Sequence, residues 1–160
     1  MPRQAVPSYV YVLVVVAHAG RFLLVHERKH GQTWYLPAGG VEPGETVVNA
    51  AIRETWEEAG IAVQPEGLLW VEHEWLGVGG SLASRWRFIL TARPVGATTP
   101  KHIADQHTLE ARWATTDELE EYPFRDYAVV PMLKHVQAGA LVTPLRFYRA
   151  IERKRAPGED

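Results

Sequence analysis

The chain has 160 residues, 46% of them hydrophobic and 22% charged, which is the length and balance of one globular domain. The formal net charge of −2 excludes a general electrostatic attraction to nucleic acid, so we expect no nucleic-acid partner. The lack of cysteine excludes a disulfide scaffold, a thiolate metal site and a cysteine nucleophile. We expect a single domain over residues 1–160, with a basic, solvated tail from about residue 146.

Residues 10–17 are apolar, but this run is too short to span a bilayer. The first residues lack the charged region and the cleavage site of a signal peptide. We therefore expect a cytoplasmic protein without a membrane partner, either a monomer or a homodimer.

The first part of the chain has the pattern of strands and tight turns. Residues 8–17 are rich in valine and tyrosine and predict a buried strand. Ala19-Gly20 predicts a turn into a second strand over residues 21–26, which completes a hairpin. Residues 34–37 predict a short extended segment, and glycine-containing turns at 39–40 and 43–44 precede a helix.

That helix is predicted over residues 46–59, with Gly60 in the position of a left-handed C-terminal cap. Apolar or small residues at helical spacing predict the face that packs on the sheet: Val48, Ile52, Thr55 and Ala59. Glu54, Glu57 and Glu58 lie three and four positions apart, so we expect them to cluster on a side turned away from that face.

The remaining elements complete an α+β pattern. Residues 67–73 and 85–91 predict two strands joined by a glycine-rich loop at 77–80, and residues 108–114 predict a third. Residues 115–118 have the pattern of a capped start to a short helix, and 127–137 predict another helix. The fold class expected is a mixed β-sheet sandwiched between α-helices.

The three clustered glutamates repel one another, and their position near the helix C-terminus is also unfavourable for negative charge. A divalent cation would offset this cost, and oxygen ligands select a hard ion, Mg²⁺ or Mn²⁺. An ordinary solvated acidic face is the alternative, and the spacing does not decide between the two. The small residues of the segment 37–40 would let its backbone approach a ligand closely.

Residues 39–61 resemble the Nudix box, G-x5-E-x7-R-E-U-x-E-E-x-G-U, beginning at Gly39 and filling every charged and glycine position. The one departure is Thr55, where the family prefers a bulky aliphatic residue. The Nudix fold, a sheet sandwiched between helices, agrees with the elements predicted above. The resemblance implies an enzyme that uses metal-activated water to split a phosphoanhydride bond.

The resemblance also implies roles for individual residues. Metal ligands are expected to be the carboxylates of Glu54, Glu57 and Glu58 and the main-chain carbonyl of Ala38. Arg53 and Glu45 complete the catalytic set by orienting these carboxylates. One of the clustered carboxylates is a candidate to take the proton from the attacking water.

Many relatives use a further acidic residue from a later loop, and Asp105 and Glu110 are the candidates for it. His107 stands at a position where close relatives can carry glutamate, which weakens this assignment.

The box does not select a substrate, but other segments carry a resemblance. Residues 34–39, 41–46 and 90–94 resemble animal Nudix phosphatases that act on oxidised guanine nucleoside diphosphates. Residues 54–58 and the segment around Pro144 are similar to bacterial Nudix phosphatases of broad range. We therefore expect a small-molecule nucleotide substrate, a nucleoside di- or triphosphate. The alternatives are an ADP-ribose or other nucleotide-sugar pyrophosphatase, and a non-catalytic nucleotide-sensing module.

Residues outside the box are candidates to contact this substrate. Arg28 and Arg125 could each bind a phosphate group through two hydrogen bonds, and Phe124 and Trp75 could stack on a base.

Overall fold

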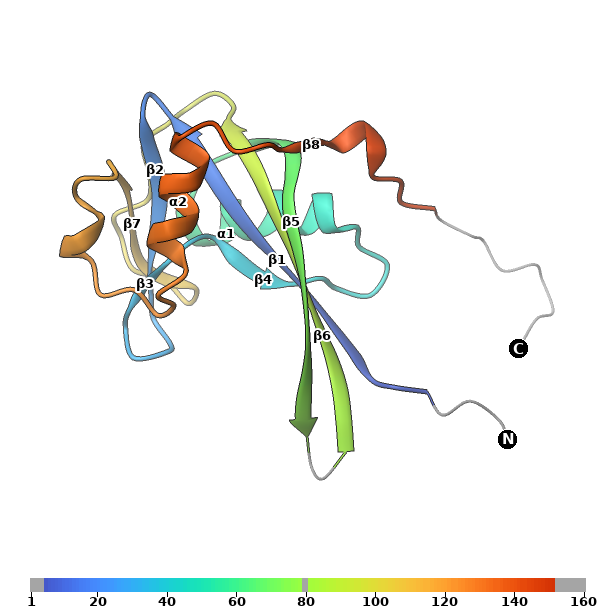
Figure 1. Cartoon of the computed structure of the whole chain (residues 1–160). Helices are drawn as coiled ribbons and strands as arrows, with labels where there is room; N and C mark the ends of the chain where they lie inside the picture. The colour runs from blue at the N-terminus through green and yellow to red at the C-terminus, as the bar shows by residue number, and fades with distance from the viewer. Residues whose placement is uncertain (1–4, 79–80, 152–160) are drawn as a thin grey trace.

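The computed structural model describes residues 5–78 and 81–151. Two α-helices, two short 3₁₀ helices and eight strands are described (Figure 1). In chain order they are β1 (Ser8–His18), β2 (Arg21–Glu27), β3 (Trp34–Tyr35), β4 (Ala38–Gly40), α1 (Val47–Ala59), β5 (Val63–Val78), β6 (Ser81–Pro94), β7 (Thr108–Ala114), η1 (Leu119–Glu121), α2 (Val129–Gln137), β8 (Thr143–Pro144) and η2 (Leu145–Phe147).

Strand β1 lies at the centre of the sheet. Along one edge it pairs in parallel with β6, in a register that runs from Ser8↔Ser84 to Val16↔Ala92. Its other edge pairs with β4, and its last residues pair with the start of β2. Strand β5 continues the sheet beyond β6 and pairs with β8, while β3 and β7 pair with β2. This mixed pairing confirms the predicted α+β class.

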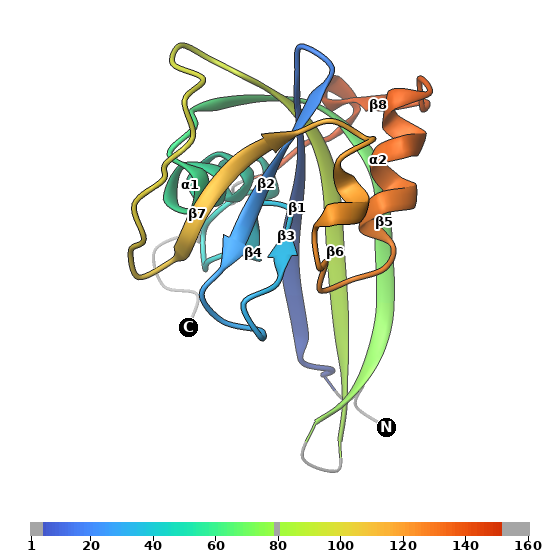
Figure 2. The same cartoon turned by 90° about the vertical axis from the view of Figure 1, so that its left-hand side faces the viewer.

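Helices cover both faces of the sheet, with α1 on one side and α2 on the other (Figure 2). The middle of β1 is buried and contacts α1, which explains why residues 12–16 are all apolar. On α2 the residues that enter the core are Val129, Met132 and Leu133.

The buried face of α1 differs from the one predicted. Thr55 and Ala59 are buried as expected, but Ile52 is 39% exposed and Val48 is only half-buried. The buried face is formed by Val47, Ala50, Ala51, Glu54, Thr55 and Ala59. Alanines let the helix approach the sheet closely, and this turns Glu54 inward, so the glutamates do not all point away from the packed side.

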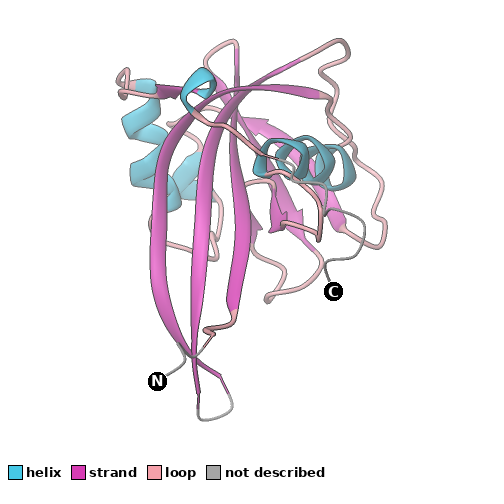
Figure 3. Cartoon of the chain, turned by 90° about the vertical axis from the view of Figure 1, so that its right-hand side faces the viewer, coloured by secondary structure: helices cyan, strands magenta, loops and turns pink. Residues whose placement is uncertain are grey.

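Strands β5 and β6 are longer than the predicted 67–73 and 85–91. They form a hairpin that extends well beyond the helices (Figures 1 and 3). Gly77 and Val78 of the predicted loop belong to β5, and residues 79–80 lie outside the described part of the chain.

Several short elements also differ from the sequence prediction. Strands β4 and β8 were not expected, and α2 begins at Val129 rather than at residue 127. The capped start predicted at 115–118 leads only into the 3₁₀ turn η1, where the Glu118 carboxylate accepts the backbone N–H and hydroxyl of Thr115 at 2.7 and 2.8 Å. Turn η2 occupies the start of the predicted tail, whose residues 152–160 lie outside the described range. None of the helices described is long and apolar enough to cross a membrane.

Candidate active site

Both ends of α1 are fixed by specific hydrogen bonds. At its start, the Thr46 side chain accepts the backbone N–H of Asn49 at 3.1 Å, and at its end Gly60 has the predicted left-handed conformation, with φ 68°. The last carbonyls are bound by the segment 101–108: Lys101 Nζ donates to the Glu57 carbonyl at 2.5 Å, and the Thr108 hydroxyl donates to the Glu58 carbonyl at 2.6 Å. These donors stabilise the helix end that bears the glutamates.

Thr55 fits its buried position without a polar penalty. Its hydroxyl donates to the Ala51 carbonyl at 2.7 Å, one turn back along the helix. This accounts for the one departure from the box pattern, because the hydroxyl finds its partner within α1.

Strand β4 presents backbone groups to α1. The Val14 N–H donates to the Pro37 carbonyl at 2.9 Å, and in the antiparallel register Ala38 stands opposite Leu13 in the next, non-hydrogen-bonded pair. The N–H and carbonyl of Ala38 therefore point away from β1. The Ala38 N–H donates to Glu58 Oε2 at 2.9 Å, and the carbonyl lies on the same side of the strand, as a metal ligand there must.

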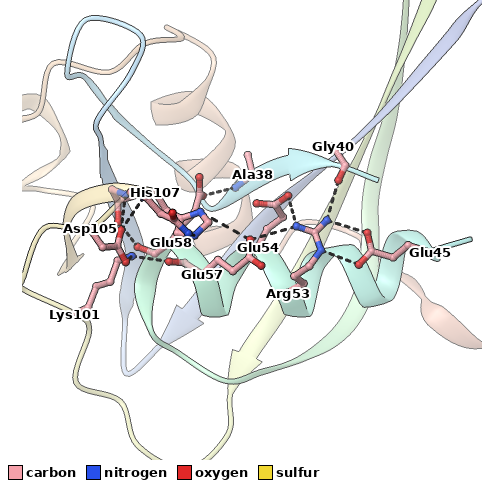
Figure 4. Close-up of polar contacts among 12 residues, drawn as sticks. Ala38, Gly40, Glu45, Arg53, Glu54, Glu57, Glu58, Lys101, Asp105 and His107 are labelled. Carbon is pink, nitrogen blue, oxygen red and sulfur yellow. Dashed lines mark hydrogen bonds and ion pairs between the residues drawn. The ribbon is translucent and has the colours of Figure 1, made fainter. Parts of the chain in front are cut away.

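Arg53 links the other acidic side chains of the box (Figure 4). Its guanidinium forms a two-point ion pair with Glu45, at 3.0 and 2.9 Å, and donates to the Gly40 carbonyl at 2.9 Å. The same group lies 2.7 Å from Glu54 Oε1 and 3.4 Å from Glu57 Oε2. Arg53 thus bridges Glu45 to the carboxylates of Glu54 and Glu57.

Gly39 lies against the carboxylate of Glu54. A Cβ atom at this position would stand 1.9 Å from Glu54 Oε1, far inside van der Waals contact. Only glycine lets β4 come this close to α1 while Glu54 remains in place.

The environment changes the proton affinity of these carboxyls. Burial, together with the nearby charges of Glu54 and Glu27, raises the pKa of Glu58 to about 8, against the opposing hydrogen bond from Ala38. Burial also raises the pKa of Glu54, although the Arg53 guanidinium beside it acts in the opposite direction. The hydrogen bond from Arg53 lowers the pKa of Glu45. The two carboxyls next to β4 are thus held without enough positive charge to offset their burial.

A hollow of about 760 Å³ adjoins the Glu58 end of this row, within the size range of small-molecule sites. Residues from the middle of β1, the end of β2 and the loop after it, β3, β4, α1, β5, β6 and the segment before α2 line the hollow. They are Tyr11, Val12, Leu13, Glu27, His30, Tyr35, Ala38, Gly39, Glu58, Glu74, Arg85, Arg87, Arg125, Asp126 and Tyr127.

Of the four substrate contacts expected outside the box, the structure brings only Arg125 to this hollow. Arg28 points elsewhere, and its Nε donates to the Asp105 carbonyl at 2.5 Å. Phe124 packs against the core and Tyr122, while Trp75 is 57% exposed on the projecting hairpin.

The candidates for a further acidic residue are engaged in other pairs. The Asp105 carboxylate accepts from Lys101 Nζ at 2.7 Å and from the backbone N–H of His107 at 2.8 Å. Glu110 forms a two-point ion pair with Arg112, at 2.9 and 3.1 Å. Neither residue lines the hollow.

Sequence reasoning missed other polar residues of the hollow, notably Arg85, Arg87 and Glu27. The sequence could have indicated the two arginines, because side chains alternate between the two faces of a strand and residues 85 and 87 therefore share one face of β6. There each arginine meets a carboxylate of β5, Arg85 with Glu74 at 2.8 Å and Arg87 with Glu72 at 2.5 Å.

Comparison with known proteins places this arrangement in a family. Residues 7–133, most of the chain, match the family described as NUDIX domain. The chain belongs to the Nudix family. Over 131 residues it is 37% identical to a human protein named 8-oxo-dGDP phosphatase NUDT18, a match that covers 79% of this chain and 38% of that protein. It is also 34% identical over 133 residues to Phosphatase NudJ of Escherichia coli K12, covering 82% of this chain and 84% of NudJ.

A solved structure agrees with the assignment. The chain is similar to a NUDIX hydrolase from Nitrosomonas europaea, with a TM-score of 0.74 and 28% sequence identity over 91% of this chain and 97% of that one. This Nudix chain spans well under half the length of the NUDT18 proteins, 38% of the human and 31% of the mouse one.

Nudix proteins generally use a divalent metal ion, and the donor set here fits a hard one. All the expected ligands are oxygens, and no ion pair of Glu58 exists among the described residues to offset its burial. Within residues 5–78 and 81–151, no three acidic or histidine side chains are already arranged to hold a metal ion. The reason is that Arg53 engages Glu54 and Glu57, while the Ala38 N–H engages Glu58.

Millimolar Mg²⁺ or Mn²⁺ is expected to raise the Tm, and more so at about pH 8.5 than at about pH 5.5. Because burial raises the pKa of Glu58 from 4.5 to about 8, the native state retains a proton that the unfolded state releases in this window. The contribution of Glu58 to the stability of the metal-free protein is therefore fully present below about pH 4.5 and is lost as the pH rises through 8, where the bare carboxylate is available to a cation.

Thermal melts with and without metal at the two pH values measure this effect. The Glu57→Gln and Glu58→Gln variants should lose most of the metal-dependent shift. A Tm that does not respond to metal at either pH would contradict a cation site at these glutamates.

Proposed function

We propose that this protein is a Mg²⁺- or Mn²⁺-dependent hydrolase that splits a phosphoanhydride bond in a nucleoside di- or triphosphate. The observation that carries the proposal is the placement of the box. Glu54, Glu57 and Glu58 form a row on α1, beside the backbone of β4 and next to a hollow that contains guanidinium and aromatic groups. Arg53 holds Glu54 and Glu57, and the Ala38 N–H holds Glu58. A purely sensing module would not need all three carboxylates.

The residues around the row have separable tasks. A divalent cation held by Glu54, Glu57, Glu58 and the Ala38 carbonyl would lower the pKa of a bound water and neutralise charge on the phosphoryl group. Arg53 keeps Glu54 and Glu57 in place through its ion pairs. One of the three clustered carboxylates is suited to accept a proton from the attacking water.

Arg125 is the candidate cation for a phosphate group, because its ion-pair partner Glu27 lies near Glu58. Arg85 and Arg87 line the hollow too, but each forms an ion pair with a β5 carboxylate, and Arg87 also lies 3.5 Å from Asp126. All three guanidiniums are thus ion-paired, and the choice of Arg125 rests on its place beside Glu27 and Glu58.

The size and shape of the hollow favour a substrate with one nucleoside. The exposed ring of Tyr127 and the ring of Tyr35 lie in its wall, whereas Trp75, the possible second stacking platform, is outside it. The relatives named as phosphatases, one of them for 8-oxo-dGDP, support the same substrate class.

We expect kcat/KM to be higher for nucleoside di- or triphosphates, oxidised guanine forms included, than for ADP-ribose, NADH or diadenosine polyphosphates. The physical reason is that a two-nucleoside substrate needs a second stacking platform, and Trp75, the candidate for it, lies outside the lining of the hollow. The measurement is kcat/KM over this panel with Mg²⁺, with the products separated by chromatography to identify the bond that is cleaved.

A preference of tenfold or more for ADP-ribose or a dinucleotide, about 1.4 kcal/mol in transition-state binding, would contradict the substrate class but not the hydrolase. Nucleotide binding without any turnover of the panel would instead support the sensing module.

A further inference from the structure

Glu27 is a buried acidic residue in the wall of the hollow. It is the last residue of β2, at a register shift in the pairing with β7, and its side chain is only 11% exposed. It lines the same hollow as Glu58, and its charge contributes to the raised pKa of Glu58, so the two carboxylates are near each other. Burial of a carboxylate at this place requires partners.

Those partners come from two loops. Glu27 Oε1 lies 2.9 Å from Arg125 Nη1 and 3.2 Å from His30 Nδ1. The Thr33 hydroxyl lies 3.4 Å from Glu27 Oε2 but closer, at 3.1 Å, to the His30 carbonyl. The charged contact to Arg125 is therefore the main one that fixes the Glu27 carboxylate.

Arg125 is in turn held at both ends. Its backbone N–H donates to the Trp34 carbonyl at 3.1 Å, which attaches the segment before α2 to β3. Its guanidinium carbon stands 3.9 Å from the centre of the buried Tyr35 ring, a close cation–π contact. The side chain remains 32% exposed, so the guanidinium is open to a ligand in the hollow.

We propose that Glu27 is a positioning residue, which holds the Arg125 guanidinium against Tyr35 so that it can bind a phosphate oxygen of a nucleotide whose phosphoanhydride lies at the glutamate row. The ligand class is the phosphate chain of a nucleoside di- or triphosphate. This inference rests on the proposed function and adds a residue that lies outside the box.

The physical basis is preorganisation. A free arginine side chain has many rotamers, and fixing one of them when the substrate binds costs on the order of 1 kcal/mol or more. Glu27 and Tyr35 impose that order in advance, so more of the binding energy of the phosphate contact appears as affinity. A residue that acts in this way changes KM far more than kcat.

The test is a double-mutant cycle of Glu27→Gln and Arg125→Ala, measured as kcat and KM for GDP with Mg²⁺. We expect Glu27→Gln to raise KM by about tenfold, with kcat within about twofold of wild type. In the Arg125→Ala background, the same change should alter KM by less than about twofold, because the group that it positions is gone. Glu66→Gln is the matched control, since it breaks an exposed ion pair with Arg93 and should leave both constants unchanged.

Two other results would overturn the proposal. Equal effects of Glu27→Gln with and without Arg125 would show that it acts independently. A weaker affinity for Mn²⁺ alone, measured by electron paramagnetic resonance without nucleotide, would make Glu27 a metal ligand instead. The positioning role predicts a Mn²⁺ affinity within about twofold of wild type. If Glu27→Gln does not fold, as judged by circular dichroism, Glu27→Asp takes its place in the cycle, because it keeps the charge but shortens the side chain.

A protein that is not a nucleotide hydrolase would give a different result from one in which only the positioning role is wrong. In that case wild type would hydrolyse no nucleotide of the panel, and the cycle would be measured on the Kd for GDP by calorimetry with Mn²⁺. Coupling of Glu27 to Arg125 in that Kd would retain the inference, and its absence would refute it.

Discussion

Glu57→Gln and Glu58→Gln are each expected to lower kcat by about a hundredfold or more while the fold is kept. Each change removes a negative oxygen that holds a cation or takes a proton, and a hundredfold corresponds to about 2.7 kcal/mol of transition-state stabilisation. Glutamine retains the shape of the side chain, and in Glu58→Gln the amide oxygen can still accept the Ala38 N–H. Steady-state kinetics with saturating Mg²⁺ and circular dichroism measure the two expectations.

We expect the loss of kcat only for substitutions of the glutamates on α1. Glu120→Gln changes an exposed glutamate of η1 and should leave kcat as in wild type. Turnover close to that of wild type in both α1 variants would remove this helix from consideration as the active site.

Gly39→Ala is expected to reduce kcat/KM by about tenfold or more and to lower the free energy of unfolding by about 1–3 kcal/mol. The added Cβ would stand 1.9 Å from Glu54 Oε1 and 2.1 Å from its Cδ. Either β4 moves away from α1 or the carboxylate leaves its position beside Arg53, and both outcomes distort the row.

Gly40→Ala is the matched comparison, because a Cβ at that neighbouring position meets nothing within 4 Å. Denaturant unfolding and kinetics on the two variants separate steric displacement from a general intolerance of β4 to side chains. Equal, small effects in both variants would contradict the close approach of Gly39 and Glu54.

The sequence predicted the α1 helix well because the signals are local. Thr46 and Gly60 mark the ends of the helix through hydrogen bonds and a backbone conformation that involve only near neighbours. The spacing of the glutamates follows from helical geometry alone. The family match then added what spacing did not decide.

What the sequence did not predict depends on tertiary contacts. The apolar stripe through Val48 and Ile52 was a plausible face, but the fold buries the alanine side, where α1 can approach the sheet. Arg28 and Arg125 looked equivalent as phosphate ligands, and only the pairing of Trp34 with the segment before α2 brings Arg125 into the hollow. In the sequence nothing distinguishes Glu27 from other glutamates at strand ends, because its partner Arg125 is brought beside it only by the fold.

The parallel pairing of β1 with β6 has a consequence for how the catalytic centre comes into being. Ser8 pairs with Ser84, so a long stretch of chain must close before this register can form, and folds with such distant contacts reach the native state slowly. Helix α1 has its own caps and can begin to form early. Strand β4, however, is attached to β1 and approaches its final place against α1 only as β1 takes its position in the sheet. A chain in which β1 has not yet paired therefore has the box glutamates but not the β4 backbone beside which they lie in the folded protein.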